Sequence, residues 1–148
     1  MTVRGAGGRA EPAGSTLFAV VAAHRTGQPL HQEISALGAR FVRRAWTAPV
    51  YRLIALPGPG VLRGGIVAAP SGGTAVEVEL HRLPGAAIGA LRRLLPPALA
   101  VGPVELARGG TVPGLVCVAE PAGALDVSAH GSWPAFLLAT TGVPVARA

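Results

Sequence analysis

The sequence contains no lysine, a single cysteine and few aromatic residues. One cysteine, Cys117, excludes an intramolecular disulfide and a cluster of thiolate metal ligands. Long hydrophobic runs are also missing: the apolar run at residues 17–23 is too short to span a bilayer, and the glycine-rich start is too polar for a signal peptide. We therefore expect a cytoplasmic protein without a membrane segment.

All of the basic charge comes from 13 arginines, which with seven acidic residues give a formal net charge of +6. The arginines are scattered, and no aromatic residues are interleaved with them as a base-stacking surface requires. Guanidinium groups suit bidentate contacts with carboxylates, and a positive field attracts small anions. The composition therefore favours a small acidic ligand and argues against nucleic-acid binding.

The chain of 148 residues is long enough for one domain with one core. Residues 1–15 carry almost no large apolar side chains, so we expect a disordered leader, and residues 142–148 are interpreted as a loose tail. Residues 16–141 then form the single domain. Frequent glycine and proline favour short strands and turns over long helices.

Alternating and continuous apolar patterns predict strands in five segments. These are residues 17–23, residues 40–56 as a bulged strand or bent hairpin broken at Pro49, residues 66–69 as an edge strand, residues 75–83, and residues 101–120 as a hairpin with a glycine turn. Short helices are predicted at residues 30–39, 84–95 and 134–140. Pro113 and Gly114 indicate a bulge in the hairpin. The predicted class is α+β, with a strongly curved, mostly antiparallel or mixed sheet that forms a small β-barrel with peripheral short helices.

The strand at residues 75–83 carries polar side chains at alternate positions, Glu77, Glu79 and His81. We expect this face to lie in solvent while the apolar face lies in the core; a carboxylate and metal site is the alternative. Both tryptophans, Trp46 and Trp133, are expected in the core. No bound metal or cofactor is predicted.

The candidate site is the loop that ends the apolar run at residues 17–23. His24 stands at the mouth of this strand, where it could transfer a proton, and Gly27 allows a positive φ angle in the turn that follows. Pro29 directs the chain toward the next helix. The alternative is a structural histidine in an ordinary strand-to-helix turn.

Five blocks carry a resemblance to a known family: VVAAHRTGQPL, LGARFVRRAWTAPVYRLIALPG, GGTAVEVELHRLP, VGPVELARGGTVPGLVCV and ALDVSAHGSW. In this order and spacing they resemble the C-terminal domain of allophanate hydrolase along residues 17–138. That family is similar in fold to gamma-glutamyl cyclotransferase, which implies a small mixed barrel with peripheral helices.

The resemblance implies that this domain decarboxylates N-carboxycarbamate, the product of the family's amidase domain, on the route from urea to ammonia and carbon dioxide. The amidase uses a serine, serine and lysine set, so a chain without lysine is not expected to hydrolyse allophanate itself. We expect a stand-alone second domain that acts as a lyase on a small dicarboxylate. A separately encoded amidase is a candidate partner.

The family's loop motif GAHLSGxPLN places its histidine on His24 and its glycine on Gly27. Two residues depart from it: Ala22 replaces a glycine, and His31 replaces an asparagine. His24 is the predicted catalytic residue. We expect the backbone amides of residues 25–27 to stabilise the developing charge, and Arg25 or an inward-facing Arg43 or Arg44 to hold a carboxylate. The predicted substrate-binding residues are Ala23, Arg25, Thr26, Gly27, His31, Arg43 and Arg44.

Two other functions remain open at this level. The domain could be a non-catalytic accessory module that binds an amidase, which the changes at Ala22 and His31 favour. A gamma-glutamyl cyclotransferase fits less well, because the loop lacks the tyrosine, glycine and serine start expected for that activity.

Overall fold

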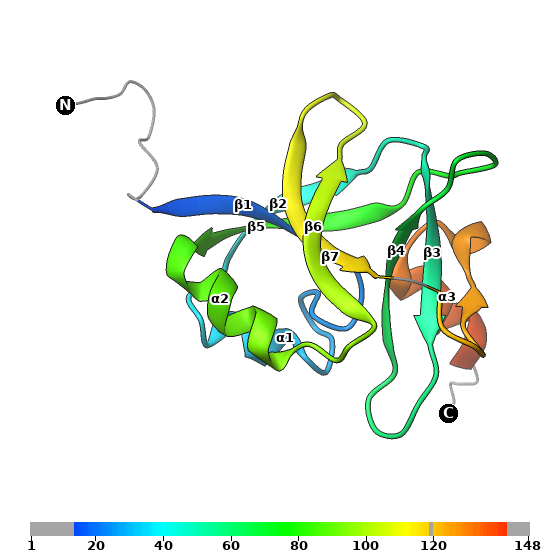
Figure 1. The fold of residues 1–148 in the computed structure, drawn as a ribbon, viewed down its shortest axis with the longest axis horizontal. Coiled ribbons are helices and arrows are strands. Elements are labelled where there is room, and N and C mark those ends of the chain that lie inside the picture. Colours follow the sequence, from blue (N-terminus) through cyan, green and yellow to red (C-terminus); the bar gives the residue numbers. More distant parts are fainter. Residues whose placement is uncertain (1–13, 119, 142–148) are drawn as a thin grey trace.

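The computed structural model describes residues 14–118 and 120–141. The expected leader at residues 1–15 lies outside this part of the chain except for Gly14 and Ser15, and Ser15 belongs to strand β1 (Ser15–Val20) rather than to a leader. The expected tail at residues 142–148 lies outside it as well. Eight strands form one sheet with short helices around it (Figure 1). The strands are β1 Ser15–Val20, β2 Arg40–Trp46, β3 Tyr51–Leu56, β4 Arg63–Ala68, β5 Glu77–Pro84, β6 Leu99–Glu105, β7 Thr111–Cys117 and β8 Leu125–Asp126. The helices are α1 His31–Ser35, α2 Gly85–Leu94, the 3-10 helix Ser128–His130 and α3 Trp133–Thr141.

The sheet is mixed, as predicted, in the order β2-β5-β1-β7-β4-β3-β8, with β6 paired to β7. β7 runs parallel to β1 and to β4, and the other pairs are antiparallel. The predicted barrel is wrong, because the sheet does not close. β2 and β6 do not pair with each other; just beyond their ends, Thr47 and Leu106 form an isolated bridge. Barrel closure depends on register between distant strands, which local alternation does not encode.

Several predicted elements are confirmed, among them β1, helix α2 after Pro84 and the β6–β7 hairpin. The hairpin has no bulge at Pro113 and Gly114, since its register runs without a break; the bulge lies in β2, between Phe41 and Arg43. The helix predicted at residues 30–39 is shorter, as α1 covers only His31–Ser35.

The strand predicted at the sheet edge is in fact interior, because β4 lies between β3 and β7. The first residues of β4 include two glycines that pack tightly against other segments. A Cβ atom on Gly64 would come within 2.3 Å of the Trp133 ring, and one on Gly65 within 3.0 Å of the Cys117 sulfur. Glycine serves close packing here.

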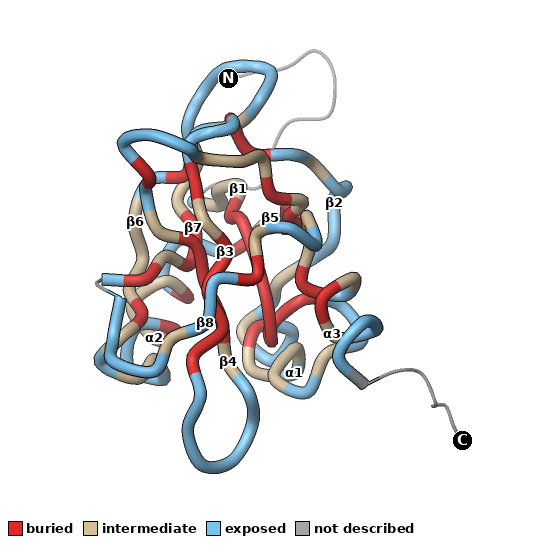
Figure 2. Tube along the Cα trace, turned by 90° about the vertical axis from the view of Figure 1, so that its right-hand side faces the viewer, coloured by how far each residue is buried: buried red, intermediate tan, exposed pale blue. Residues whose placement is uncertain are grey.

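The core lies along the central strands, which Figure 2 shows as buried. Phe18 and Trp133 are each 1% exposed, and the Trp133 ring packs 5.2 Å from that of Phe136. Trp133 is therefore the core anchor that was predicted, whereas Trp46 is 49% exposed and that prediction is wrong. Within residues 14–118 and 120–141, no helix has the length and apolar character needed to cross a membrane.

Candidate functional site

The loop after β1 is held by its own backbone hydrogen bonds. Arg25 N donates to Ala22 O at 3.0 Å, and Leu30 N donates to Ala23 O at 2.9 Å. Gly27 has a φ of +84°, which confirms the predicted positive angle. These bonds fix His24 and Arg25 at the start of the loop, where both side chains are buried, while Thr26 and Gly27 remain exposed.

The polar face of β5 lies beneath this loop. Glu79 is 5% exposed and His81 is 1% exposed, so the prediction of a solvated face is wrong. Alternation of polar and apolar residues marks two chemically different faces, but it does not show whether water or a polar loop covers the second one. Here the covering loop carries the complementary groups.

Glu79 is the acceptor on which this arrangement centres. Its Oε1 accepts hydrogen bonds from Thr26 N and Thr26 Oγ1, each at 2.9 Å, and lies 3.0 Å from His81 Nε2. Burial by itself raises the pKa of the Glu79 carboxyl, but these hydrogen bonds and the charge of Arg25 outweigh burial, so the pKa is lowered. Glu79 is therefore an ionised, buried carboxylate.

Arg25 pairs with the same strand. Its Nη2 donates to Glu77 Oε1 at 3.0 Å, and its Nη1 donates to the Glu77 carbonyl oxygen at 2.9 Å. The side chain is only 4% exposed. Of the backbone amides predicted as donors, those of Arg25 and Thr26 already donate within the protein. These groups thus hold the loop on β5, which leaves little of them for a substrate.

His24 forms a pair with Glu33 of α1. The distance from His24 Nε2 to Glu33 Oε1 is 2.8 Å, and the two side chains are 3% and 29% exposed. Burial lowers the pKa of His24 more than its pair with Glu33 raises it, and the charges of Arg63 and His31 lower it further. A neutral ring beside a carboxylate carries its hydrogen on Nε2, which leaves Nδ1 as a base.

Arg63, at the start of β4, is a residue that the sequence did not predict for the site. Its charge lowers the pKa of His24, and its buried Nη1 has no hydrogen-bond partner in the described part of the chain. An unsatisfied buried guanidinium nitrogen costs free energy unless an anion or water supplies an acceptor. Arg63 and His24 are about forty residues apart in the sequence. No local sequence pattern indicates that two residues so far apart come together.

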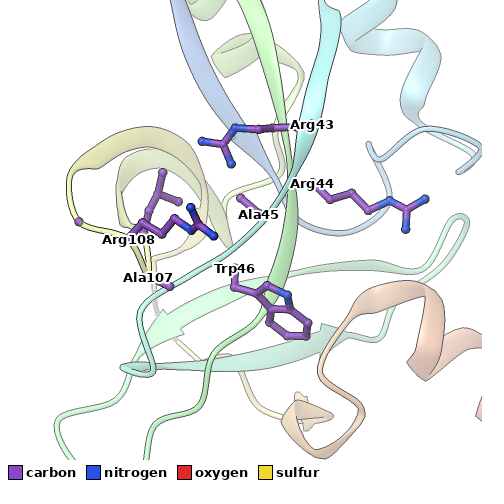
Figure 3. A pocket seen from close by; sticks show the side chains of 8 residues that line it. Arg43, Arg44, Ala45, Trp46, Ala107 and Arg108 are labelled. Atoms are coloured by element: carbon purple, nitrogen blue, oxygen red, sulfur yellow. The ribbon is translucent and has the colours of Figure 1, made fainter.

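Arg43 and Arg44 separate onto opposite faces of β2. Arg44 is paired with Glu79 of β5, and residues paired across an antiparallel ladder share a face, so Arg44 lies on the loop side of the sheet. Figure 3 shows Arg43 extending to the other side. Both arginines are exposed, so the expected inward orientation is wrong. Only Arg44 shares a face with the loop site.

The remaining predicted residues lie around the same loop. Ala23 is buried, and His31 is half-buried with its Nδ1 3.0 Å from the His24 carbonyl oxygen. The rings of His31 and His81 lie 5.7 Å apart. Residues 14–118 and 120–141 hold no group of three side chains arranged to bind a metal ion. Burial raises the pKa of Cys117 to about 11, so this thiol is protonated and unreactive at neutral pH.

Comparison with known protein families shows which family this chain belongs to. The family model of the allophanate hydrolase C-terminal domain matches residues 16–138. The chain belongs to the allophanate hydrolase C-terminal domain family. A relative in the curated proteins is urea amidolyase of Saccharomyces cerevisiae, 31% identical over 131 residues, which are 85% of this chain and 7% of the yeast protein.

Solved structures give the same result for this allophanate hydrolase C-terminal domain. Allophanate hydrolase of Kluyveromyces lactis matches with a TM-score of 0.81 and 28% identity, over 85% of this chain and 21% of that one. The uropathogenic Escherichia coli-specific protein c4763 matches with a TM-score of 0.76 and 32% identity, over 87% of this chain and 97% of that one. A gamma-glutamyl cyclotransferase, 12% identical with a TM-score of 0.56, shares the fold. The chain spans 7% of the length of its curated relatives.

Proposed function

We propose that this domain decarboxylates N-carboxycarbamate or a related small dicarboxylate during urea degradation, with His24 as the proton donor. The main support is the His24–Glu33 pair, 2.8 Å apart, which joins the loop after β1 to helix α1 within the residues that match the family model. A carboxylate that accepts from one ring nitrogen fixes the tautomer and leaves the other nitrogen to act on a ligand. No described residue hydrogen-bonds to His24 Nδ1.

The proposed step moves one proton. A bound dianion raises the pKa of His24, so Nδ1 takes up a proton while Nε2 stays hydrogen-bonded to Glu33. The bond between the nitrogen and one carboxylate carbon breaks, carbon dioxide leaves, and the electron pair remains on nitrogen. His24 Nδ1 donates its proton to that nitrogen, which gives carbamate and returns the ring to its neutral form. The step consumes one proton, which His24 takes up from water: the dianion and this proton give carbamate, with a single negative charge, and carbon dioxide.

The substrate's second carboxylate needs a cation that is not already paired. Arg25 is committed to Glu77, whereas the buried Nη1 of Arg63 has no hydrogen-bond partner among the described residues, and the charge of Arg63 acts on His24. Arg44 lies on the same face of the sheet and is exposed. We assign Arg63 as the main carboxylate anchor and Arg44 as a second, because guanidinium groups bind carboxylates with two parallel hydrogen bonds.

A second function, that of a non-catalytic module docked on a separately encoded amidase, is favoured by one observation. The edge strand β2 is exposed along nearly its whole length. The two functions make opposite predictions for turnover, because a docking module does not change the decay rate of N-carboxycarbamate.

The test is turnover of substrate made in place. An allophanate amidase without a C-terminal domain would generate ¹³C-labelled N-carboxycarbamate, and NMR would follow the carbon dioxide released with and without this protein. We expect acceleration by the wild type and a loss of about 10²-fold or more in His24→Gln, since general acid catalysis contributes on that order. The glutamine at position 24 can still donate a hydrogen bond to Glu33. Arg92→Gln, on the exposed side of α2, is the control and should match the wild type. Decay no faster than with the amidase alone would refute the lyase.

A further inference from the structure

A groove of about 600 Å³ lies where the sheet remains open. One wall is the strand β2, with Arg43, Arg44, Ala45 and Trp46, and the other is the turn after β6, residues 106–109. The bridge between Thr47 and Leu106 closes its inner end, where Ala107 N donates to Trp46 O at 2.9 Å. No further β-pairing joins the two described segments beyond this bond, and the groove runs along the free side of β2.

Among the residues that the structure describes, β2 pairs only with β5, so its other side presents unpaired backbone groups. All residues of β2 except Ala45 are exposed. Trp46 O points toward β6, whereas Thr47 N donates to Val76 O on the opposite side. The N–H and C=O groups of a strand residue point the same way and alternate along the strand, so those of Arg44 point into the groove. An incoming strand could pair with them.

The side chains around the groove are cationic and aromatic. Figure 3 shows Arg43 and Arg108 on the same side of β2, with their guanidinium groups toward the space between them. Neither forms an ion pair with any residue in the described part of the chain. Phe41 and Trp46 on the same strand are 52% and 49% exposed. Charge and apolar surface thus occur together along one free edge.

We propose that this edge binds an extended acidic segment of a partner protein, which adds to β2 as a further strand and places carboxylates on Arg43 and Arg108. Main-chain hydrogen bonds would supply affinity, and the arginines would select for acidic side chains. A second copy of this chain is a poorer occupant, because edge-to-edge pairing of two β2 strands brings like charges together. The proposal uses no residue of the His24 site other than the backbone of Arg44, so it stands or falls independently of the decarboxylase.

Charged edge strands also occur simply to prevent aggregation. That role requires only repulsion, and it predicts no specific binding. The experiment must therefore separate strand addition from general attraction between a basic protein and an acidic peptide.

The probe is a fluorescein-labelled peptide of about eight residues that alternates glutamate and valine, titrated with the full chain and followed by anisotropy. The same peptide with every internal amide N-methylated keeps its charges but cannot donate to β2. We expect the first peptide to bind and the methylated one to bind at least ten-fold more weakly. On binding, hydrogen exchange at the Arg44 amide should slow.

Two double variants with the same change in net charge complete the design. Arg43→Gln with Arg108→Gln should weaken binding at least ten-fold, whereas Arg92→Gln with Arg93→Gln, both exposed on α2, should leave it unchanged. Equal weakening by both pairs, equal binding of both peptides, or no binding would overturn the proposal. Two further results would overturn the proposal. One is tighter binding of a single-stranded oligonucleotide than of the acidic peptide. The other is self-association of the wild type that is lost in the double variant Arg43→Gln with Arg108→Gln.

Discussion

Arg25 and Arg43 show how differently two parts of this small domain treat the same side chain. Arg25 is 3% exposed, contacts Glu77 and Glu79, and fastens the loop after β1 to β5. Arg43 is exposed on an edge strand and has no ion pair in the part of the chain that the structure describes. The buried pair supports the fold and cannot readily bind a ligand, whereas the unpaired cations remain available for one.

The largest effect on stability should come from the buried side of this comparison. Glu79→Gln removes the charge that Thr26, His81 and Arg25 face, and breaking a buried ionic network costs about 3–5 kcal/mol. Urea unfolding would measure the free energy of unfolding. Glu105→Gln, at an exposed position, is the control and should change it by less than about 0.5 kcal/mol. Equal effects of both variants would contradict the view that Glu79 fastens the loop.

A smaller loss is expected at the turn of the same loop. Gly27→Ala forces a residue with a Cβ into a φ of +84°, which costs about 1–2 kcal/mol although no atom lies within 4 Å of the new methyl group. Gly89→Ala, within helix α2 and also without close neighbours, should instead stabilise the protein by about 0.4–1 kcal/mol. The same urea unfolding measures both. Changes of the same sign would show that loop geometry does not set the cost.

The pH dependence of stability should identify the buried histidine. The pKa of His24 in the folded protein lies below the unfolded value of 6.5, because burial opposes its charge. Between these two values the unfolded chain binds a proton that the folded chain does not, so the free energy of unfolding falls as the pH drops from about 7 through 6.5 toward the folded pKa. His24→Gln should flatten this slope. Parallel curves for both proteins would assign the slope to other groups.

The smallest effect is expected on the exposed side. Arg43→Gln should change the free energy of unfolding by less than about 0.5 kcal/mol, since the side chain is solvated and unpaired within the described residues. Thermal unfolding at low and moderate salt would measure it. A loss of more than 1 kcal/mol would show that Arg43 supports the fold, and the contrast with Arg25 would disappear.

The elements that local pattern predicts well are those whose signals are themselves local. The run before His24 became β1, Pro84 precedes α2, and the glycine turn at residues 109–110 joins β6 to β7 with both φ angles positive. Apolar runs, a helix start and a tight turn each depend on neighbouring residues. The place of His24 in the loop and the positive φ of Gly27 belong to the same class, since the loop follows directly from the end of a strand.

The errors concern contacts between distant segments. Glu79 and His81 read as solvent-facing because alternation is identical whether water or a polar loop covers the strand. The barrel prediction fails because local sequence patterns do not show whether distant strands pair. In the structure a single isolated bridge, between Thr47 and Leu106, joins the chain near the ends of β2 and β6. Glu33 and Arg63 were not identified for a similar reason: their roles depend on proximity to His24, which the fold creates.

The central claim is that His24 and Arg63 form a site for a small dianion, and titration with malonate tests it most directly. Malonate replaces the nitrogen of N-carboxycarbamate with a methylene group and cannot decarboxylate under mild conditions. Calorimetry should detect binding to the wild type, at least ten-fold weaker binding to His24→Gln and to Arg63→Gln, and unchanged binding to Arg43→Gln. Absence of binding to the wild type, or equal affinity in all four proteins, would contradict the account.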